Sequence, residues 1–170
     1  MHAMGNISRL WSRLRWAMLF IALSAPLSTH AQAVVAPALT FATVDGQKIR
    51  LGDLRGKIVL INFWATSCAI CLAEMPDLIQ TYQQYRKRGL EVIAIAMSYD
   101  QSDLINQYVA KYGLPFPVVW DTKGGIGRSF RDVKVTPTTF IVDKKGRLIS
   151  RTVGIIDFEK LRKFLDDALS

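Results

Sequence analysis

The chain has 170 residues, half of them hydrophobic, and carries a formal net charge of +8. This length and apolar content predict one globular domain with a complete hydrophobic core, and they exclude a largely disordered chain. The longest block of like charge is the tripeptide Arg86-Lys87-Arg88, so the charge pattern does not predict a protein that binds nucleic acid.

The beginning of the chain has the pattern of an export signal. Arg9, Arg13 and Arg15 precede an apolar run over residues 16–27, and Ala31-Gln32-Ala33 is an A-x-A cleavage pattern. A membrane-spanning helix needs about 20 apolar residues, so this run is short for a span. We therefore predict a signal peptide that is cleaved after Ala33, with cleavage after Ala31 and an uncleaved anchor in the inner membrane as the alternatives.

This pattern predicts that the chain has two parts, a signal over residues 1–33 and a folded domain over residues 34–170. Cleaved or anchored, the signal leaves its basic end in the cytoplasm and the domain outside it. We therefore expect the domain in the periplasm, where thiols meet oxidising conditions.

Hydrophobic periodicity predicts the elements of the domain in chain order. A first hairpin turns at Asp45-Gly46. The apolar run over residues 58–64 has the pattern of a strand that is buried on both faces. Pro76 falls inside the helix that follows and is expected to kink or split it. The predicted strands span residues 39–44, 47–51, 58–64, 90–97, 118–120, 138–142 and 148–153, and the predicted helices span residues 68–88, 102–112, 125–130 and 157–169.

This order predicts an α/β fold with a central mixed sheet flanked by helices. Buried strands alternate with crossover helices first, which indicates parallel pairing. The last two strands form an antiparallel hairpin that leads into a final helix. The first hairpin is an N-terminal extension of this arrangement.

The chain has two cysteines, Cys68 and Cys71, and they lie where the strand over residues 58–64 meets the next helix. A thiol reacts as thiolate, and the unpaired N–H groups and the dipole of a helix N-terminus favour an anion. We therefore predict that Cys68 is the attacking nucleophile of a disulfide exchange and that Cys71, one turn further on, is the resolving thiol.

Three other interpretations of the pair are weaker. After residue 33 the chain has no His and no further Cys, so the pair lacks the other ligands of a zinc site. A purely structural disulfide that closes so small a loop contributes only about 2 kcal/mol. The third interpretation is a pair of buried, unreactive thiols. It disagrees with the composition of the neighbouring Ala65-Thr66-Ser67, which is typical of a solvent-facing turn. We predict neither a metal nor a cofactor.

Two further residues are candidates from their positions. Glu74 lies three residues after Cys71 on the same helix face, where a carboxylate could accept and return the proton of that thiol. Its position alone favours an ordinary exposed glutamate. Pro137 precedes a strand, and a cis peptide there would expose the main chain of Thr136 to an extended substrate, although trans is the default for proline.

The segment Phe63-Trp64-Ala65-Thr66-Ser67-Cys68-Ala69-Ile70-Cys71-Leu72-Ala73-Glu74-Met75-Pro76, taken with Pro137-Thr138-Thr139-Phe140-Ile141-Val142-Asp143, resembles the thioredoxin superfamily, and most closely its TlpA/ResA-like extracytoplasmic thiol-disulfide oxidoreductases. The resemblance covers residues 39–169 and implies a thioredoxin-like fold. It implies that Glu74 is an active-site acid and that Pro137 is a cis-proline facing the cysteines. Thr136, Pro137 and Trp64 are then the candidate substrate-binding residues.

The sequence departs from this family around the sulfur atoms. Ser67 stands where the family usually has Trp, and Ala69-Ile70 lacks the proline often found before the second cysteine. Asn62 stands where thioredoxins carry a buried Asp, as is common in the TlpA-like branch. Because of these departures, the sequence does not predict the reduction potential of the cysteine pair. It therefore does not predict whether the protein preferentially reduces or oxidises its substrates.

The sequence therefore predicts a periplasmic thiol-disulfide oxidoreductase that reduces disulfides of exported proteins and takes electrons from a membrane donor of the thiol-disulfide type. Apocytochrome c is the typical client that the resemblance implies. The alternatives are a net oxidase or isomerase and a non-catalytic copper-binding module, since thiolates suit Cu(I). A peroxide-reducing enzyme is disfavoured because the P-x-x-x-T-x-x-C pattern is absent.

Overall fold

The computed structural model describes residues 34–170, so the signal predicted over residues 1–33 lies outside the described residues. The described chain forms a two-stranded hairpin and a five-stranded mixed sheet with helices, which confirms the predicted α/β class. The strands are β1 (Thr40–Ala42), β2 (Lys48–Arg50), β3 (Ile58–Trp64), β4 (Leu90–Ala96), β5 (Val118–Trp120), β6 (Thr138–Val142) and β7 (Leu148–Val153). The helices are α2 (Ala69–Tyr85), α3 (Ser102–Tyr112), α4 (Gly125–Ser129) and α5 (Phe158–Ala168), and two short 3-10 turns are η1 (Leu51–Leu54) and η2 (Arg86–Arg88).

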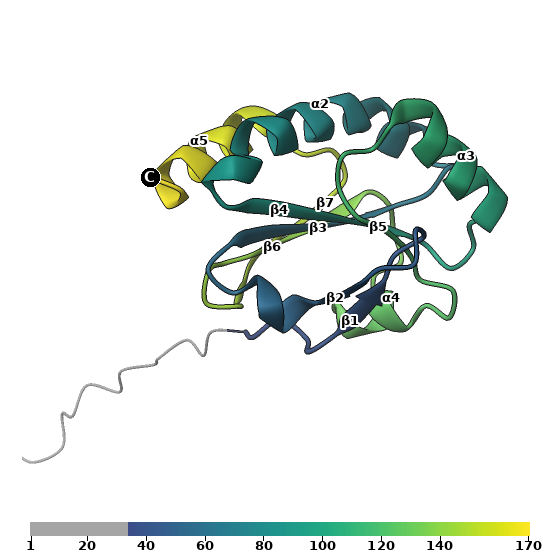
Figure 1. The fold of residues 1–170 in the computed structure, drawn as a ribbon, viewed down its shortest axis with the longest axis horizontal. Coiled ribbons are helices and arrows are strands. Elements are labelled where there is room, and N and C mark those ends of the chain that lie inside the picture. Colours follow the sequence, from purple (N-terminus) through teal and green to yellow (C-terminus); the bar gives the residue numbers. More distant parts are fainter. Residues whose placement is uncertain (1–33) are drawn as a thin grey trace, which may run out of the picture. The chain divides into compact units, whose positions relative to one another are not determined.

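Strand β3 is the centre of the large sheet, whose order is β5-β4-β3-β6-β7 (Figure 1). It pairs with β4 in parallel and with β6 in antiparallel orientation. Phe63, near the end of β3, is level with Ile95 of β4 and with Thr138 of β6. The segments that follow β3 and β4 and the segment that precedes β6 therefore meet at one edge of the sheet.

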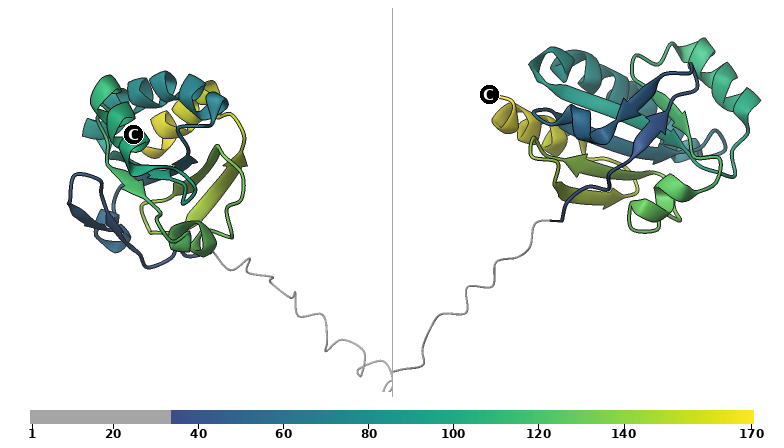
Figure 2. Two further views of the ribbon diagram at one scale, coloured as in Figure 1. Left: turned by 90° about the vertical axis from the view of Figure 1, so that its right-hand side faces the viewer. Right: turned by 60° about the horizontal axis from the view of Figure 1, so that its bottom comes forward.

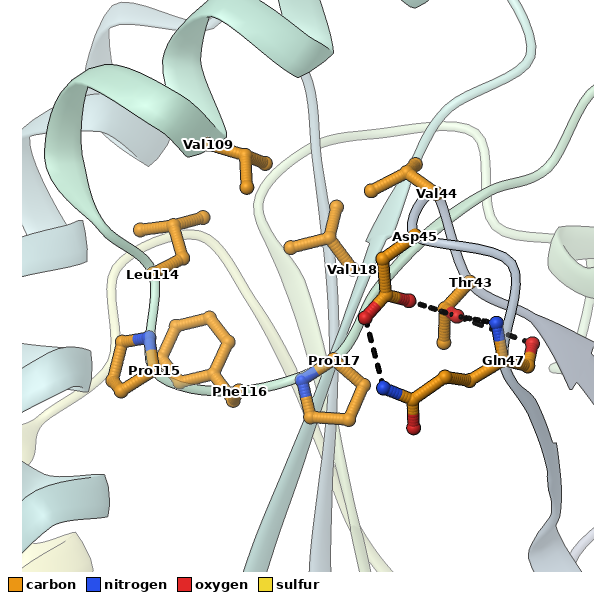
Figure 3. A pocket seen from close by; sticks show the side chains of 10 residues that line it. All are labelled: Thr43, Val44, Asp45, Gln47, Val109, Leu114, Pro115, Phe116, Pro117 and Val118. Carbon is orange, nitrogen blue, oxygen red and sulfur yellow. Dashed lines mark hydrogen bonds between the residues drawn. The ribbon is translucent and has the colours of Figure 1, made fainter.

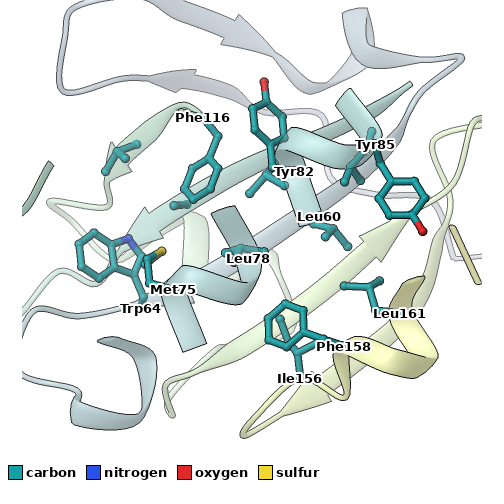
Figure 4. Packing of buried hydrophobic residues seen from close by; sticks show 14 of the residues in the cluster. Leu60, Trp64, Met75, Leu78, Tyr82, Tyr85, Phe116, Ile156, Phe158 and Leu161 are labelled. Carbon is teal, nitrogen blue, oxygen red and sulfur yellow. The ribbon is translucent and has the colours of Figure 1, made fainter. Parts of the chain in front are cut away.

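The two faces of the sheet carry separate cores, because side chains alternate along a strand. Helices α2, α3 and α5 cover one face, and the hairpin and α4 cover the other (Figures 1 and 2). In β3, Ile58, Leu60 and Trp64 belong to the core beneath the three helices, part of which is drawn in Figure 4. Val59 and its alternate neighbours Ile61 and Phe63 belong to the other core. Asn62 interrupts the apolar series on the helix-covered face.

Helix α2 continues through Pro76, so the predicted split into two helices is wrong. A proline inside a helix removes one hydrogen bond and clashes with the preceding turn. Here Pro76 is exposed, while Met75 and Leu78 on either side of it are buried in the core. Packing against the sheet therefore keeps the residues on both sides of Pro76 in one helix. Gly89 ends the segment with φ of 108°, a conformation that suits glycine.

The hairpin is joined to the outer edge of the large sheet. Val44 N donates a hydrogen bond of 2.8 Å to the carbonyl oxygen of Val118 in β5. A cavity of about 290 Å³ lies between the hairpin turn and the segment 114–118 (Figure 3). None of the predicted site residues lines this cavity. None of the helices formed by residues 34–170 combines the length and apolar character that a membrane span requires.

Candidate active site

Cys68 and Cys71 are joined by a disulfide at the N-terminus of α2. Their Cα atoms are 5.2 Å apart. Cys68 is the N-cap residue, as predicted, and its Sγ accepts a hydrogen bond of 3.2 Å from Cys71 N. The first turn of α2 therefore directs a backbone donor and the positive end of its dipole at the sulfur of Cys68, which is where a thiolate would be stabilised.

The two sulfur-bearing residues differ in exposure. Cys71 has no exposed surface, whereas Cys68 is half-buried. Ile70 between them is 50% exposed. Ala65 is buried, so the preceding turn faces solvent less than its composition predicts, and Thr66 beside it is half-buried. A partner can reach Cys68 from solvent but cannot reach Cys71.

Glu74 is a buried carboxyl group, so its alternative assignment as an exposed helix residue is wrong. The residue is 5% exposed. Its Oε1 accepts a hydrogen bond of 3.2 Å from Asn62 Nδ2, and its Oε2 accepts one of 3.2 Å from Ile156 N. Burial raises the pKa of Glu74, and the hydrogen bonds from Ile156 and Asn62 oppose that rise without cancelling it.

A carboxyl group in this setting can exchange a proton with a neighbouring thiol. Glu74 lies three residues after Cys71, and residues at this spacing share a helix face. Its raised pKa brings its protonation closer to neutral pH than that of a solvent-exposed glutamate. The geometry therefore gives Cys71 a nearby proton acceptor that solvent does not reach directly.

Asn62 organises this side of the disulfide, a role that the sequence analysis did not assign. Its Nδ2 donates to Glu74 and also donates a hydrogen bond of 3.0 Å to Thr139 Oγ1 of β6. The signal for it was present, because Asn62 is the polar residue in an otherwise apolar buried strand. A buried amide is expected to have specific partners.

Asp100, which follows β4, contacts the segment that leads to Cys68 and was also missed. Its Oδ2 accepts a hydrogen bond of 2.7 Å from Thr66 N, and its Oδ1 accepts one of 2.6 Å from Thr66 Oγ1 and one of 2.9 Å from Gln101 N. Asp100 is 8% exposed. The position of Asp100 just after a buried parallel strand could have indicated a role, because binding and active sites form beyond the carboxyl ends of such strands.

The Thr136–Pro137 peptide bond is cis, as the resemblance implied. The segment directly precedes β6, at the same edge of the sheet as Cys68. Pro137 is buried, and its carbonyl oxygen accepts a hydrogen bond of 2.8 Å from Gly154 N. Thr136 is half-buried, and its hydroxyl lies 3.3 Å from the hydroxyl of Tyr99, a side chain that is 58% exposed.

Trp64 does not fit the substrate-binding role predicted for it. The residue has no exposed surface. It lies in the core beneath the helices (Figure 4). The centroid of its ring is 5.2 Å from that of Tyr108. The reason is the alternation of β3, which places Trp64 on the same covered face as Leu60. In this structure Trp64 supports the site from below and offers no surface to a substrate.

Across residues 34–170, no three His, Cys, Asp or Glu side chains are arranged to hold a metal ion. The chemistry that the described residues do support is thiol-disulfide exchange at Cys68, with a buried second thiol and a buried carboxyl group.

Comparisons with known proteins agree with this chemistry. Residues 33–151 match the AhpC/TSA family. The thiol-disulfide oxidoreductase ResA of Bacillus thuringiensis is 37% identical over 131 residues, which are 76% of this chain and 74% of that protein. A thiol:disulfide interchange protein of the thioredoxin family from Chlorobium tepidum superposes with a TM-score of 0.75 at 28% identity, covering 82% of this chain and 99% of that one. A putative thioredoxin from Neisseria meningitidis gives a TM-score of 0.74 at 38% identity over 80% of this chain and 90% of that one.

Proposed function

Because the chain belongs to the AhpC/TSA family of thioredoxin-like proteins and is a thiol-disulfide oxidoreductase, we propose that it works in the periplasm as a reductase of disulfides in exported proteins. The export pattern at the beginning of the chain supports the compartment. The observation that carries the proposal is the asymmetry of the pair, with Cys68 accessible at a helix N-terminus and Cys71 fully buried beside Glu74.

The cycle begins with the reduced pair. The Cys68 thiolate attacks one sulfur of the substrate disulfide, and the other substrate sulfur leaves as a thiolate that takes a proton from solvent. Cys71 then gives its proton to Glu74 and attacks the Cys68 sulfur, which releases the second substrate sulfur as a thiolate that also takes a proton from solvent. Two electrons have passed to the substrate, and the protein is left with the Cys68–Cys71 disulfide.

A dithiol donor closes the cycle. A thiolate of the donor attacks Cys68, and Glu74 returns its proton to the departing Cys71 sulfur. The second donor thiol then resolves the mixed disulfide and restores the Cys68–Cys71 dithiol. The predicted donor is a membrane protein of the thiol-disulfide type.

The surface around Cys68 suits an extended polypeptide. Ile70, Tyr99 and Val135 are 50%, 58% and 56% exposed. Tyr99 lies against Thr136, which places it beside the cis-proline segment. Exposed apolar side chains next to a main-chain segment fit a partner that is not fully folded, because such a partner presents both apolar side chains and free main chain.

Trapping of mixed disulfides tests the roles of the two cysteines. The variant Cys71→Ala, produced in the periplasm of the host, is expected to hold client proteins through Cys68, because the resolving thiol is absent. Mass spectrometry after non-reducing electrophoresis identifies them. The Cys68→Ala and double variants are the controls. Trapping by Cys68→Ala alone would reverse the assignment, and no trapping by any variant would contradict disulfide exchange with exported proteins.

The direction of the reaction needs its own measurement. Equilibration of the purified domain with glutathione gives its reduction potential, and reduction of insulin gives its activity. A potential at or below that of the glutathione pool supports a reductase. A clearly more oxidising potential would instead support the oxidase or isomerase, and tight stoichiometric copper without insulin reduction would support the copper-binding module.

A further inference from the structure

Asp100 places a charged group against the segment that carries the nucleophile. Three groups donate hydrogen bonds to its carboxylate, namely Thr66 N, Thr66 Oγ1 and Gln101 N. An ionised carboxylate only accepts hydrogen bonds, so this set of donors matches that form. The salt bridges formed within residues 34–170 do not include Asp100. Its carboxylate is therefore held in place by neutral donors and not by an ion pair with a described residue.

We infer that Asp100 is a positioning residue that keeps the Cys68–Cys71 pair reducing, by fixing the main chain at Thr66 and by opposing negative charge on Cys68. The inference deepens the proposed function and rests on it for the direction of the reaction. The hydrogen bonds of Asp100 go to Thr66 and Gln101 and not to a sulfur, so it acts through the segment between Thr66 and Cys68.

The charge of Asp100 is close enough to matter. Its Oδ2 is 2.7 Å from Thr66 N, and two residues of chain add at most about 7 Å between the Cα atoms of Thr66 and Cys68. The carboxylate and the Cys68 sulfur are therefore separated by a distance on the order of 10 Å, which is about the Debye length at 0.1 M salt. Because Asp100 is buried, salt screens their interaction only in part. The carboxylate lies near the N-terminal end of α2, where it competes with a Cys68 thiolate for the same positive end of the helix dipole.

The sign of the effect follows from which redox form carries the charge. The disulfide is neutral at both sulfurs, whereas the reduced protein can carry a thiolate at Cys68. A nearby carboxylate therefore destabilises only the reduced form, and a less stable reduced form is a stronger reductant. Several other ionisable groups lie on the elements around Asp100 and Cys68. Tyr99 is in the same loop, and the guanidinium of Arg128 from α4 lies at Gly124, which also faces Ser98 of that loop. The remaining groups are on α2 (Cys71, Glu74, Asp77, Tyr82 and Tyr85) and on α3 (Asp103, Tyr108, Lys111 and Tyr112).

Asp121 offers a matched control. It follows β5 as Asp100 follows β4, and it is 4% exposed. Its two oxygens accept hydrogen bonds of 3.1 Å from Ile126 N and 2.8 Å from Gly127 N, which belong to α4. It is thus a buried carboxylate that organises a loop at the same edge of the sheet but contacts α4 and not the segment of Cys68.

The test compares Asp100→Asn with Asp121→Asn in the domain over residues 34–170. The equilibrium constant with glutathione is measured at two pH values, one above and one well below the midpoint of the Cys68 alkylation profile, so that the thiolate is populated only at the first. Asp100→Asn is expected to shift this constant about threefold or more toward the dithiol above the midpoint and to leave it unchanged well below the midpoint. The alkylation profile of Cys68 is expected to move to lower pH by about one pH unit. Asp121→Asn is expected to move neither.

Equal shifts in the two variants, or an equal shift at both pH values, would overturn the role of the charge, because a purely structural effect does not depend on the thiolate. Thr66→Val keeps the charge and removes one donor. The same shift in Thr66→Val as in Asp100→Asn would assign the effect to geometry alone. Asp100→Ser, which keeps an acceptor without the charge, replaces Asp100→Asn should that variant not fold. An oxidising wild-type potential would contradict the proposed direction, while the difference between variants still measures the effect of Asp100.

Discussion

The two sides of the disulfide are built differently, although each has a buried carboxyl group. On the Cys71 side, Glu74 lies on the buried face of α2 and accepts hydrogen bonds from the side chain of Asn62 and from Ile156 N. On the Cys68 side, Asp100 accepts from the main chain and the hydroxyl of Thr66 in the segment that leads to the nucleophile. The first group lies where a proton must move, and the second lies where its negative charge opposes that of a Cys68 thiolate.

This difference separates two properties of a redox pair, the speed of resolution and the equilibrium potential. A carboxyl group whose pKa is raised by burial is suited to take and return a proton. A carboxylate fixed by three donors is suited to hold its charge. Substitutions on the Cys71 side should therefore change rates, and those on the Cys68 side should change the equilibrium.

The largest effect is expected from Glu74→Gln on the rate of resolution. An amide cannot accept the proton of Cys71, so decay of the mixed disulfide should slow by about 100-fold, the lower end of general-base effects. Single-turnover reaction with a disulfide peptide, quenched with acid and separated by chromatography, follows the intermediate. In Asp100→Asn the intermediate should decay at the wild-type rate, and its accumulation there would remove the contrast between the two sides.

The next largest effect is expected from Asn62→Ala on stability. The substitution removes the donor to Glu74 Oε1 and leaves a buried acceptor unsatisfied, which costs about 1–3 kcal/mol in the free energy of unfolding. Chemical denaturation of the oxidised domain at pH 8 measures it. Thr139→Val is the control, because it removes the other partner of Asn62 and keeps the bond to Glu74. Equal losses in the two variants would show that Glu74 does not depend on Asn62.

Glu74 should also give the domain a distinctive dependence of stability on pH. Its pKa in the folded protein is raised above its ordinary value of 4.5, so the folded state holds the proton more tightly than the unfolded chain. Its contribution to stability is thus complete below pH 4.5 and is lost as the pH rises through the folded-state pKa. The free energy of unfolding of wild type minus that of Glu74→Gln, measured by urea denaturation from pH 4 to 9, should fall across this window and then level off.

In Glu74→Gln, a flip of the Asn62 amide would let its oxygen accept from the new amide group and from Thr139 Oγ1. The hydrogen bonds are thereby restored without the charge, which makes this variant the appropriate neutral reference. A difference that rises with pH would show that Glu74 is stabilised in its charged form, opposite to the direction that its burial gives.

The smallest effect is expected from Thr66→Val on stability. Valine has nearly the shape of threonine and removes only the hydroxyl bond to Asp100, while the bond from the main-chain nitrogen remains. Loss of one hydrogen bond at a half-buried position should cost about 1 kcal/mol. Thermal unfolding at pH 7 measures it. A loss as large as that of Asn62→Ala would mean that the Cys68 side is as tightly built as the Cys71 side.

Local patterns predicted the scaffold of the site. The apolar run gave β3 with its observed bounds at Ile58 and Trp64, and the cysteines lie at the predicted helix N-terminus. These features depend on neighbours in the sequence, which period and capping rules describe. Pro76 shows the limit of such rules. Its tendency to break a helix is overridden because the residues on both sides of it pack against the sheet.

The contacts that distinguish the two sides are not local. Asn62 and Glu74 are 12 residues apart, and Thr66 and Asp100 are 34 residues apart, so the register of the sheet has to be known before the pairs are visible. Trp64 was misassigned for a related reason. A motif gives the identity of a residue but not the face of the sheet on which its side chain lies. The alternation from Leu60 to Trp64 places the Trp64 side chain under the helices.

The central place of β3 has a consequence for amide hydrogen exchange. Its main chain is paired with β4 on one side and with β6 on the other, and its side chains are buried on both faces. Amide protons in such a strand exchange with solvent only when the whole domain opens. Exchange within β3 therefore measures the free energy of global unfolding. Reduction of the disulfide is expected to change the exchange rates only of residues that follow Trp64. Deuterium uptake there would report the state of the disulfide in a protein that otherwise stays closed.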